Sequence, residues 1–187
     1  MASVPSADPA LLLTIGLLNT YNLLDDEPDH LSASVAAGLA AESGMDALAM
    51  ALSTLDRREV DRLRTVRSRL YVVFAAIEPE AKISALNAVI DEANLRPRVV
   101  GDADGVRLVA ARVSTRDDPV GDVQALAADA LASAMMAGGP RRFGTCAGDP
   151  CRCVYVDRTR SGRQRFCSQL CNDRMAAAAY RSRRAAT

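Results

Sequence analysis

Cysteine is missing from the first 140 residues of this 187-residue chain, and all five cysteines fall within positions 146–171. The start of the sequence also lacks the basic segment of a secretory signal peptide. Disulfide frameworks belong mostly to secreted proteins, and an odd number of cysteines leaves one without a partner. We therefore favour metal binding over disulfides or unligated thiols for this cluster.

The signals of an enzyme, a calcium loop or a membrane protein are also missing. His30 is the single histidine, and no pairing of a nucleophile with a base is readable in the sequence. The run Asp102-Ala103-Asp104-Gly105 starts like a calcium loop but lacks the remaining ligands and the terminal glutamate, so we expect a turn. No apolar run reaches the roughly 18 residues of a membrane span. We expect neither catalysis nor membrane insertion.

Four of the cysteines, Cys146, Cys151, Cys167 and Cys171, follow the spacing C-x4-C-x15-C-x3-C. Two short thiol pairs joined by a loop long enough to fold back can form a tetrahedral zinc site. Residues 141–187 hold few large apolar side chains, and a segment of this size seldom folds without metal or disulfides. A structural Zn²⁺ contributes on the order of 10 kcal/mol in small zinc modules. The spacing predicts one structural zinc, and four thiolates leave it no open position for catalysis.

The fifth cysteine, Cys153, leaves the ligand set open. On an extended strand Cys151 and Cys153 point to the same face, so these two are an alternative first pair. Converging two sulfurs from a C-x-C strand on one ion is awkward, whereas Gly148, Asp149 and Pro150 provide a turn between Cys146 and Cys151. We favour Cys146 and Cys151 as ligands, with Cys153 as a buried neighbour of the site.

Charge divides the chain into two parts. Residues 1–140, here called the body, carry 12 Lys/Arg and 20 Asp/Glu. Residues 141–187, here called the tail, carry 11 Arg, no Lys and three Asp. The run Ala-Gly-Gly-Pro at 137–140 breaks secondary structure between them. We expect two domains, 1–140 and 141–187, in which a basic appendage meets a polyanion such as DNA.

The expected fold class is α+β. Apolar periodicity in the body predicts helices at 10–22, 31–42, 55–77, 81–93 and 120–136, with a β-hairpin at 99–113. In the third and fourth of these helices we expect the apolar face to hold Leu63, Val66, Leu70, Val73, Ile77, Ile83, Leu86 and Ile90. The fifth helix has apolar positions at Val123, Leu126, Ala130 and Leu131.

The tail is expected to fold as a small treble-clef-like zinc finger. A strand at 151–157, a hairpin turn at 158–163 and a return at 165–166 lead back to Cys167. The alanine-rich run after Cys171 is strongly helical, so the last zinc ligand comes from the first turn of a helix. The positive end of that helix favours a thiolate.

Arginines of the tail are the candidate nucleic-acid contacts. Arginine matches phosphate and guanine with two parallel hydrogen bonds, although phosphate contacts alone give affinity without sequence choice. The candidates on the hairpin and the helix are Arg158, Arg160, Arg163, Arg165, Arg174, Arg181, Arg183 and Arg184. We interpret the arginine-rich stretch at 57–69 as a solvated helix face, with contact to nucleic acid or a partner as the alternative.

The tail resembles a CGNR-type zinc finger. The matching segments are Val154–Thr159 (VYVDRT), Arg165–Ser168 (RFCS), Cys171–Arg174 (CNDR) and Tyr180–Arg184 (YRSRR). Asn172 and Asp173 stand where that family has Gly and Asn. The body resembles the ABATE domain that usually precedes this finger, through LLNT at 17–20, the arginine-rich helix at 57–69 and LNA at 86–88. The resemblance implies a stress-induced bacterial transcription regulator.

Two functions compete at this point. In the first, the finger docks on DNA while the body senses a small-molecule effector or mediates homodimers, and the protein acts in the cytoplasm at the nucleoid. In the second, zinc only supports the fold of a protein-interaction or RNA-binding module. Binding that weakens steeply with salt and keeps a preference for one sequence distinguishes the first from the second.

Overall fold

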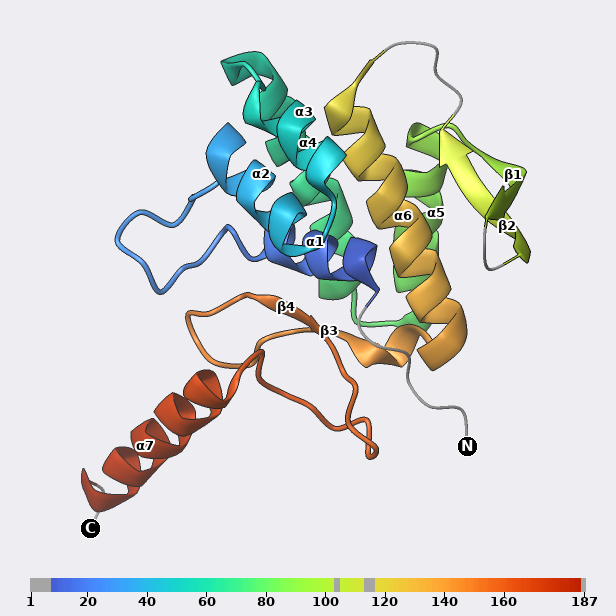
Figure 1. Ribbon diagram of the computed structural model, residues 1–187. Coiled ribbons are helices and arrows are strands. Elements are labelled where there is room, and N and C mark those ends of the chain that lie inside the picture. Colours follow the sequence, from blue (N-terminus) through green and yellow to red (C-terminus); the bar gives the residue numbers. More distant parts are fainter. Residues whose placement is uncertain (1–7, 103–104, 113–116, 186–187) are drawn as a thin grey trace.

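The computed structural model describes residues 8–102, 105–112 and 117–185. The body is mostly helical with one hairpin, and a small zinc-finger-like tail follows it, as the expected α+β fold class requires (Figure 1). The helices of the body are α1 (Pro9–Leu18), α2 (Ala33–Glu42), α3 (Asp46–Ser53), α4 (Arg57–Ala75), α5 (Pro79–Glu92) and α6 (Pro119–Gly138). The 3-10 turn η1 (Pro140–Arg142) joins the body to the tail, which holds β3 (Phe143–Thr145), β4 (Val154–Val156) and α7 (Gln169–Ala185).

The hairpin of the body pairs β1 (Leu95–Asp102) with β2 (Gly105–Arg112) in antiparallel register, from Leu95 opposite Arg112 to Asp102 opposite Gly105. It starts four residues earlier than the predicted 99–113. Asp102 and Gly105 flank its turn, as predicted, and residues 103 and 104 lie outside the described part of the chain. Among the described residues, no helix is both long and apolar enough to cross a bilayer.

Helix α4 is the centre of the body. Asp56 begins it with a capping box, in which its carboxylate accepts from Glu59 N–H while the Glu59 side chain accepts from Asp56 N–H. The helix ends at Ala75, because Ala76 is already extended (φ −58°, ψ 139°) ahead of the Pro79 that starts α5. The predicted position of Ile77 on the buried face is therefore wrong, and Ile77 is 89% exposed.

Three other details of the predicted helices differ in the structure. On α5 the buried face comprises Lys82, Leu86 and Val89, while Ile83 is exposed. Lys82 donates from Nζ to Phe74 O (2.8 Å) at the end of α4, which accounts for a lysine at a buried position. On α6, Leu126 is more exposed than predicted. Helix α3 is not among the predicted helices, although its run of Ala, Leu and Met favours a helix; it is short and begins without a side-chain cap.

The arginines of α4 bind within the body. Arg67 is 9% exposed and makes two hydrogen bonds to Asp29 (2.7 and 2.8 Å) and one to Thr20 Oγ1 (2.9 Å). Arg64 also reaches Asp29 and the carbonyl of Leu31. These contacts fix the acidic loop between α1 and α2 on α4. Arg64 and Arg67 therefore do not belong to a purely solvated helix face.

The hydrophobic core forms two clusters on either side of α1 and α4. One cluster, which includes Leu13, Leu52 and Leu63, lies between α1, α2, α3, α4 and α6. The other surrounds Phe74 and Leu131, between α1, α4, α5 and α6. Two tail residues, Phe143 and Val154, are buried in this second cluster, so the first strands of the tail pack on the body.

Candidate metal centre and basic surface

A short antiparallel pair, β3 with β4, holds the first half of the site. Phe143 pairs with Val156 and Thr145 with Val154, and the bond from Cys146 N to Cys153 O (2.8 Å) continues the pairing. In the segment between β3 and β4, a hydrogen bond from Cys151 N to Gly148 O (2.7 Å) closes a turn. The segment from Cys146 to Cys151 is therefore a tight knuckle, here called the zinc knuckle.

This pairing corrects the predicted hairpin. The strand covers Val154–Val156 rather than 151–157, and its partner is β3, which precedes the zinc knuckle. Burial of Phe143 in the body explains the difference, because it places β3 against α4 before the chain turns back. Residues 157–168 form a loop with a turn at Gly162 (φ +64°), and one bond from Ala147 N to Arg165 O (2.9 Å) ties the loop to the zinc knuckle.

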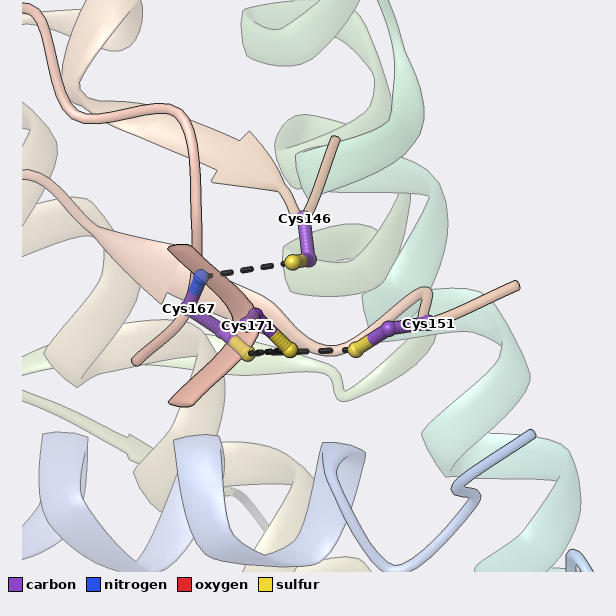
Figure 2. A group of neighbouring side chains, drawn as sticks. All are labelled: Cys146, Cys151, Cys167 and Cys171. Atoms are coloured by element: carbon purple, nitrogen blue, oxygen red, sulfur yellow. Dashed lines mark hydrogen bonds between the residues drawn. The ribbon is translucent and has the colours of Figure 1, made fainter. Parts of the chain in front are cut away.

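The four predicted ligands converge on one point (Figure 2). The sulfur atoms of Cys146, Cys151, Cys167 and Cys171 all lie within 4.8 Å of one another. Cys167 Sγ is 3.8 Å from Cys151 Sγ and 3.7 Å from Cys171 Sγ. Tetrahedral Zn²⁺ with Zn–S bonds of about 2.3 Å requires sulfurs roughly 3.8 Å apart. The donor set and its spacing fit one structural zinc ion.

The surroundings of the thiols also suit a metal. Cys146, Cys151 and Cys171 are buried, and the N–H of Cys167 donates to Cys146 Sγ (3.4 Å). Burial raises the pKa of the Cys151 thiol far above its ordinary value, and burial with the neighbouring thiols raises the pKa of Cys167 to about 12. Thiols that are reluctant to ionise alone become thiolates when a cation binds them. Cys153 is half-buried beside the cluster and is not among the four converging sulfurs.

Arg174 serves the metal centre. Its guanidinium donates to the carbonyls of Asp149 (2.6 Å) and Gly148 (2.7 Å), so α7 holds the zinc knuckle from the outside. Burial would raise the pKa of Cys171, but interactions with the other three thiols and with Arg174 lower it. The arginine of the Cys-x-x-Arg run thus joins the zinc knuckle to the last ligand. Its predicted DNA contact would compete with these two bonds.

Asp157 organises the loop that carries four of the arginines. Its buried carboxylate accepts from the Thr159 N–H (2.8 Å), the Thr159 hydroxyl (2.6 Å) and the Gln164 N–H (2.9 Å). Burial raises its pKa, but these hydrogen bonds and the nearby Arg142 hold the pKa of Asp157 below its ordinary value. Sequence reasoning missed this role. A single acidic residue in a strongly basic loop was the available signal.

The remaining seven candidate arginines are exposed. Arg158, Arg160, Arg163 and Arg165 lie on the loop after β4, and Arg181, Arg183 and Arg184 lie on the last turns of α7. Arg163 and Arg165 line an open concavity of about 640 Å³ at the start of α7, together with Gln164, Phe166 and Asn172. Helix α7 extends away from the body (Figure 1).

Two family models match the chain, one after the other. The ABATE family, described as "Putative stress-induced transcription regulator", matches residues 13–141. The CGNR zinc finger matches residues 142–184. A comparison with curated proteins found no match. The first match covers well over half of the chain, and the four converging cysteines lie within the second.

Proposed function

Because the chain belongs to the ABATE family of transcription regulators and carries a CGNR zinc finger, we propose that it binds DNA through its tail. The observation that carries this proposal is the set of seven exposed arginines on the loop and on α7, held by one zinc centre. The tail stays strongly basic when zinc is bound. Its eleven arginines and three aspartates give a net charge of +8, and four thiolates with one Zn²⁺ lower that charge by two.

The shape of the tail supports a helix entering the major groove. With 17 residues α7 is about 25 Å long at 1.5 Å per residue, and its second half is almost entirely exposed. A major groove admits one helix, and arginine is the most frequent reader of guanine there. We propose that Arg181, Arg183 and Arg184 approach the bases or their phosphates, while the loop arginines bind the backbone.

A role for the body follows from its opposite charge. The body carries 20 acidic against 12 basic residues, so it contributes repulsion rather than affinity near DNA. We propose that it regulates the finger, through a bound effector or through a second copy of the chain, in the cytoplasm at the nucleoid. A catalytic role is not proposed, because four thiolates fill the coordination sphere of the zinc.

A protein partner is the second candidate, and exposed apolar residues on α7 favour it. Leu170 is 73% exposed and Tyr180 is 55% exposed, and a protein that docks along α7 would cover both side chains. In this alternative the zinc centre supports a docking helix. Arginine-rich surfaces also bind acidic proteins, so charge alone does not separate the two candidates.

Sequencing the DNA that co-purifies with the zinc-loaded chain from cross-linked cells tests the proposal. We expect enrichment of a limited set of sites that share a sequence, and loss of that enrichment when Cys167→Ser removes the metal. Recovery of DNA without preference, or no recovery at all, would contradict a regulator that chooses its sites. Recovery of one protein in place of DNA would support the alternative.

A further inference from the structure

The side chain of Asn19 joins the body to the finger. Asn19 follows the last residue of α1, and its amide Nδ2 donates to Val154 O (3.1 Å) while its Oδ1 accepts from Val154 N–H (2.7 Å). Both polar groups of one residue in β4 are therefore bound by one amide. The Asn19 side chain therefore makes the two hydrogen bonds that a neighbouring strand would make to β4 of the β3–β4 pair. Asn19 and Val154 are 135 residues apart in the sequence.

Apolar contacts support the same joint. Val154 is 1% exposed and Phe143 is 2% exposed, and both pack in the core of the body. The rings of Phe143 and Phe74 lie 5.3 Å apart at an angle of 53°, a geometry that is favourable for aromatic pairs. These contacts hold the strands against α1 and α4. They have no directional preference comparable with the two hydrogen bonds of Asn19.

The joint lies directly beside the zinc centre. Cys151 is three residues before Val154, and Cys146 is three residues after Phe143. The second half of the metal site, Cys167 and Cys171, brings the start of α7 to the same point. Helix α7 extends away from the body (Figure 1). Arg174 ties it to the zinc knuckle, and β4, which follows the knuckle, contacts α1. The direction of α7 relative to the body therefore depends on how β4 is held.

We infer that Asn19 is a positioning residue for the proposed DNA-binding surface. It sets the orientation of the finger on the body, so that the arginines of the loop and α7 face DNA while the acidic body stays away. The amide is required because one side chain must both donate and accept. A carboxylate at this position accepts from the Val154 N–H but repels its carbonyl oxygen. This inference rests on the proposed function.

Asn19→Asp in the zinc-loaded full chain tests the inference, with Asn87→Asp as the matched control. Asn87 is exposed on α5, so the control makes the same change of charge away from the joint. Residual dipolar couplings of backbone amides measure the orientation of α7 relative to α4 without DNA. We expect one shared alignment for the wild-type chain and the control, and separate alignments for α4 and α7 in Asn19→Asp. Each helix should keep its internal couplings, which a general loss of fold would not allow.

The same samples are then titrated with a short mixed-sequence DNA duplex at low salt. If the loosened finger holds the docking orientation about a tenth of the time, its apparent Kd rises about tenfold. Asn19→Ala, which leaves Val154 unpaired without adding charge, gives the same comparison if the aspartate variant does not fold.

Unchanged alignment of α4 and α7 in the variants would overturn the role of Asn19, whatever the affinity for DNA. Loosened alignment with unchanged affinity would overturn its role in DNA binding. A wild-type chain that binds no DNA would contradict the proposed function, while the alignment data would still decide the joint.

Discussion

At the scale of single residues, the charged side chains of this chain divide between building the fold and facing solvent. Arg67 and Arg64 bind Asp29, and Arg174 binds the carbonyls of the zinc knuckle. The candidate arginines on the loop after β4 and on the last turns of α7 are exposed. A residue's charge therefore does not predict its role until its partners are known.

The cysteines give the first prediction. Cys153→Ser should keep one zinc per chain, because its sulfur is outside the four that converge, whereas Cys167→Ser should lose the metal and the fold of the loop and α7. Elemental analysis together with circular dichroism measures both effects on otherwise identical proteins. Loss of zinc from Cys153→Ser, or retention by Cys167→Ser, would show that the ligand set is different.

Asp29 gives a prediction for pH. Hydrogen bonds from Arg67, chiefly, hold the pKa of Asp29 well below its ordinary value. A carboxyl whose pKa is lower in the folded state contributes stability that is complete above its unfolded pKa of about 3.9 and is lost as the pH falls toward the folded value. The urea concentration at the midpoint of unfolding should therefore decrease as the pH is lowered below about 4. This decrease should be less steep in Asp29→Asn. An equal slope in both proteins would contradict the prediction.

At the scale of elements, the strands β3 and β4 decide how the finger attaches. Helices with a clear apolar period, such as α4 and α6, could be predicted from the sequence within a few residues. The partner of β4 could not be predicted, because three-residue strands carry no period and their pairing is set by Phe143 entering the core of the body.

The cysteine spacing predicted the cluster because metal geometry limits which thiols can meet. Asp157 and Asn19 could not be assigned roles, because their partners lie in loops or far along the chain.

Phe143 gives the prediction for this scale. Phe143→Ala removes a ring that is 2% exposed and in contact with Phe74, so it should lower the free energy of unfolding by about 3–5 kcal/mol. Tyr180→Ala is the matched control, since that ring is 55% exposed on α7 and its loss should change stability by no more than about 0.5 kcal/mol. Urea unfolding of the zinc-loaded proteins measures both. Equal effects would show that the tail does not share the core of the body.

At the scale of the whole molecule, two parts of opposite charge meet at one compact joint. In the acidic body, Arg67 binds Asp29 in the loop between α1 and α2. In the basic tail, the four converging cysteines fix the segments that carry the exposed arginines. The boundary predicted at residue 140 divides the acidic part of the chain from the basic part. It does not divide the hydrophobic core, because Phe143 and Val154 of the tail are buried in the core of the body. The finger is thus presented by the body rather than attached by a free linker.

The central claim is that the tail binds DNA through its exposed arginines, and the salt dependence of binding tests it most directly. Fluorescence anisotropy of a labelled duplex should be measured for the parent, for Arg163→Ala with Arg181→Ala, and for Arg57→Ala with Arg58→Ala, a control that removes two exposed charges from the body. If both tail arginines contact phosphates, the slope of log K against log salt should become shallower by about 1.8 in the tail variant, and the control should match the parent. A tail variant that keeps its zinc and binds with the parent's affinity and slope would contradict the account.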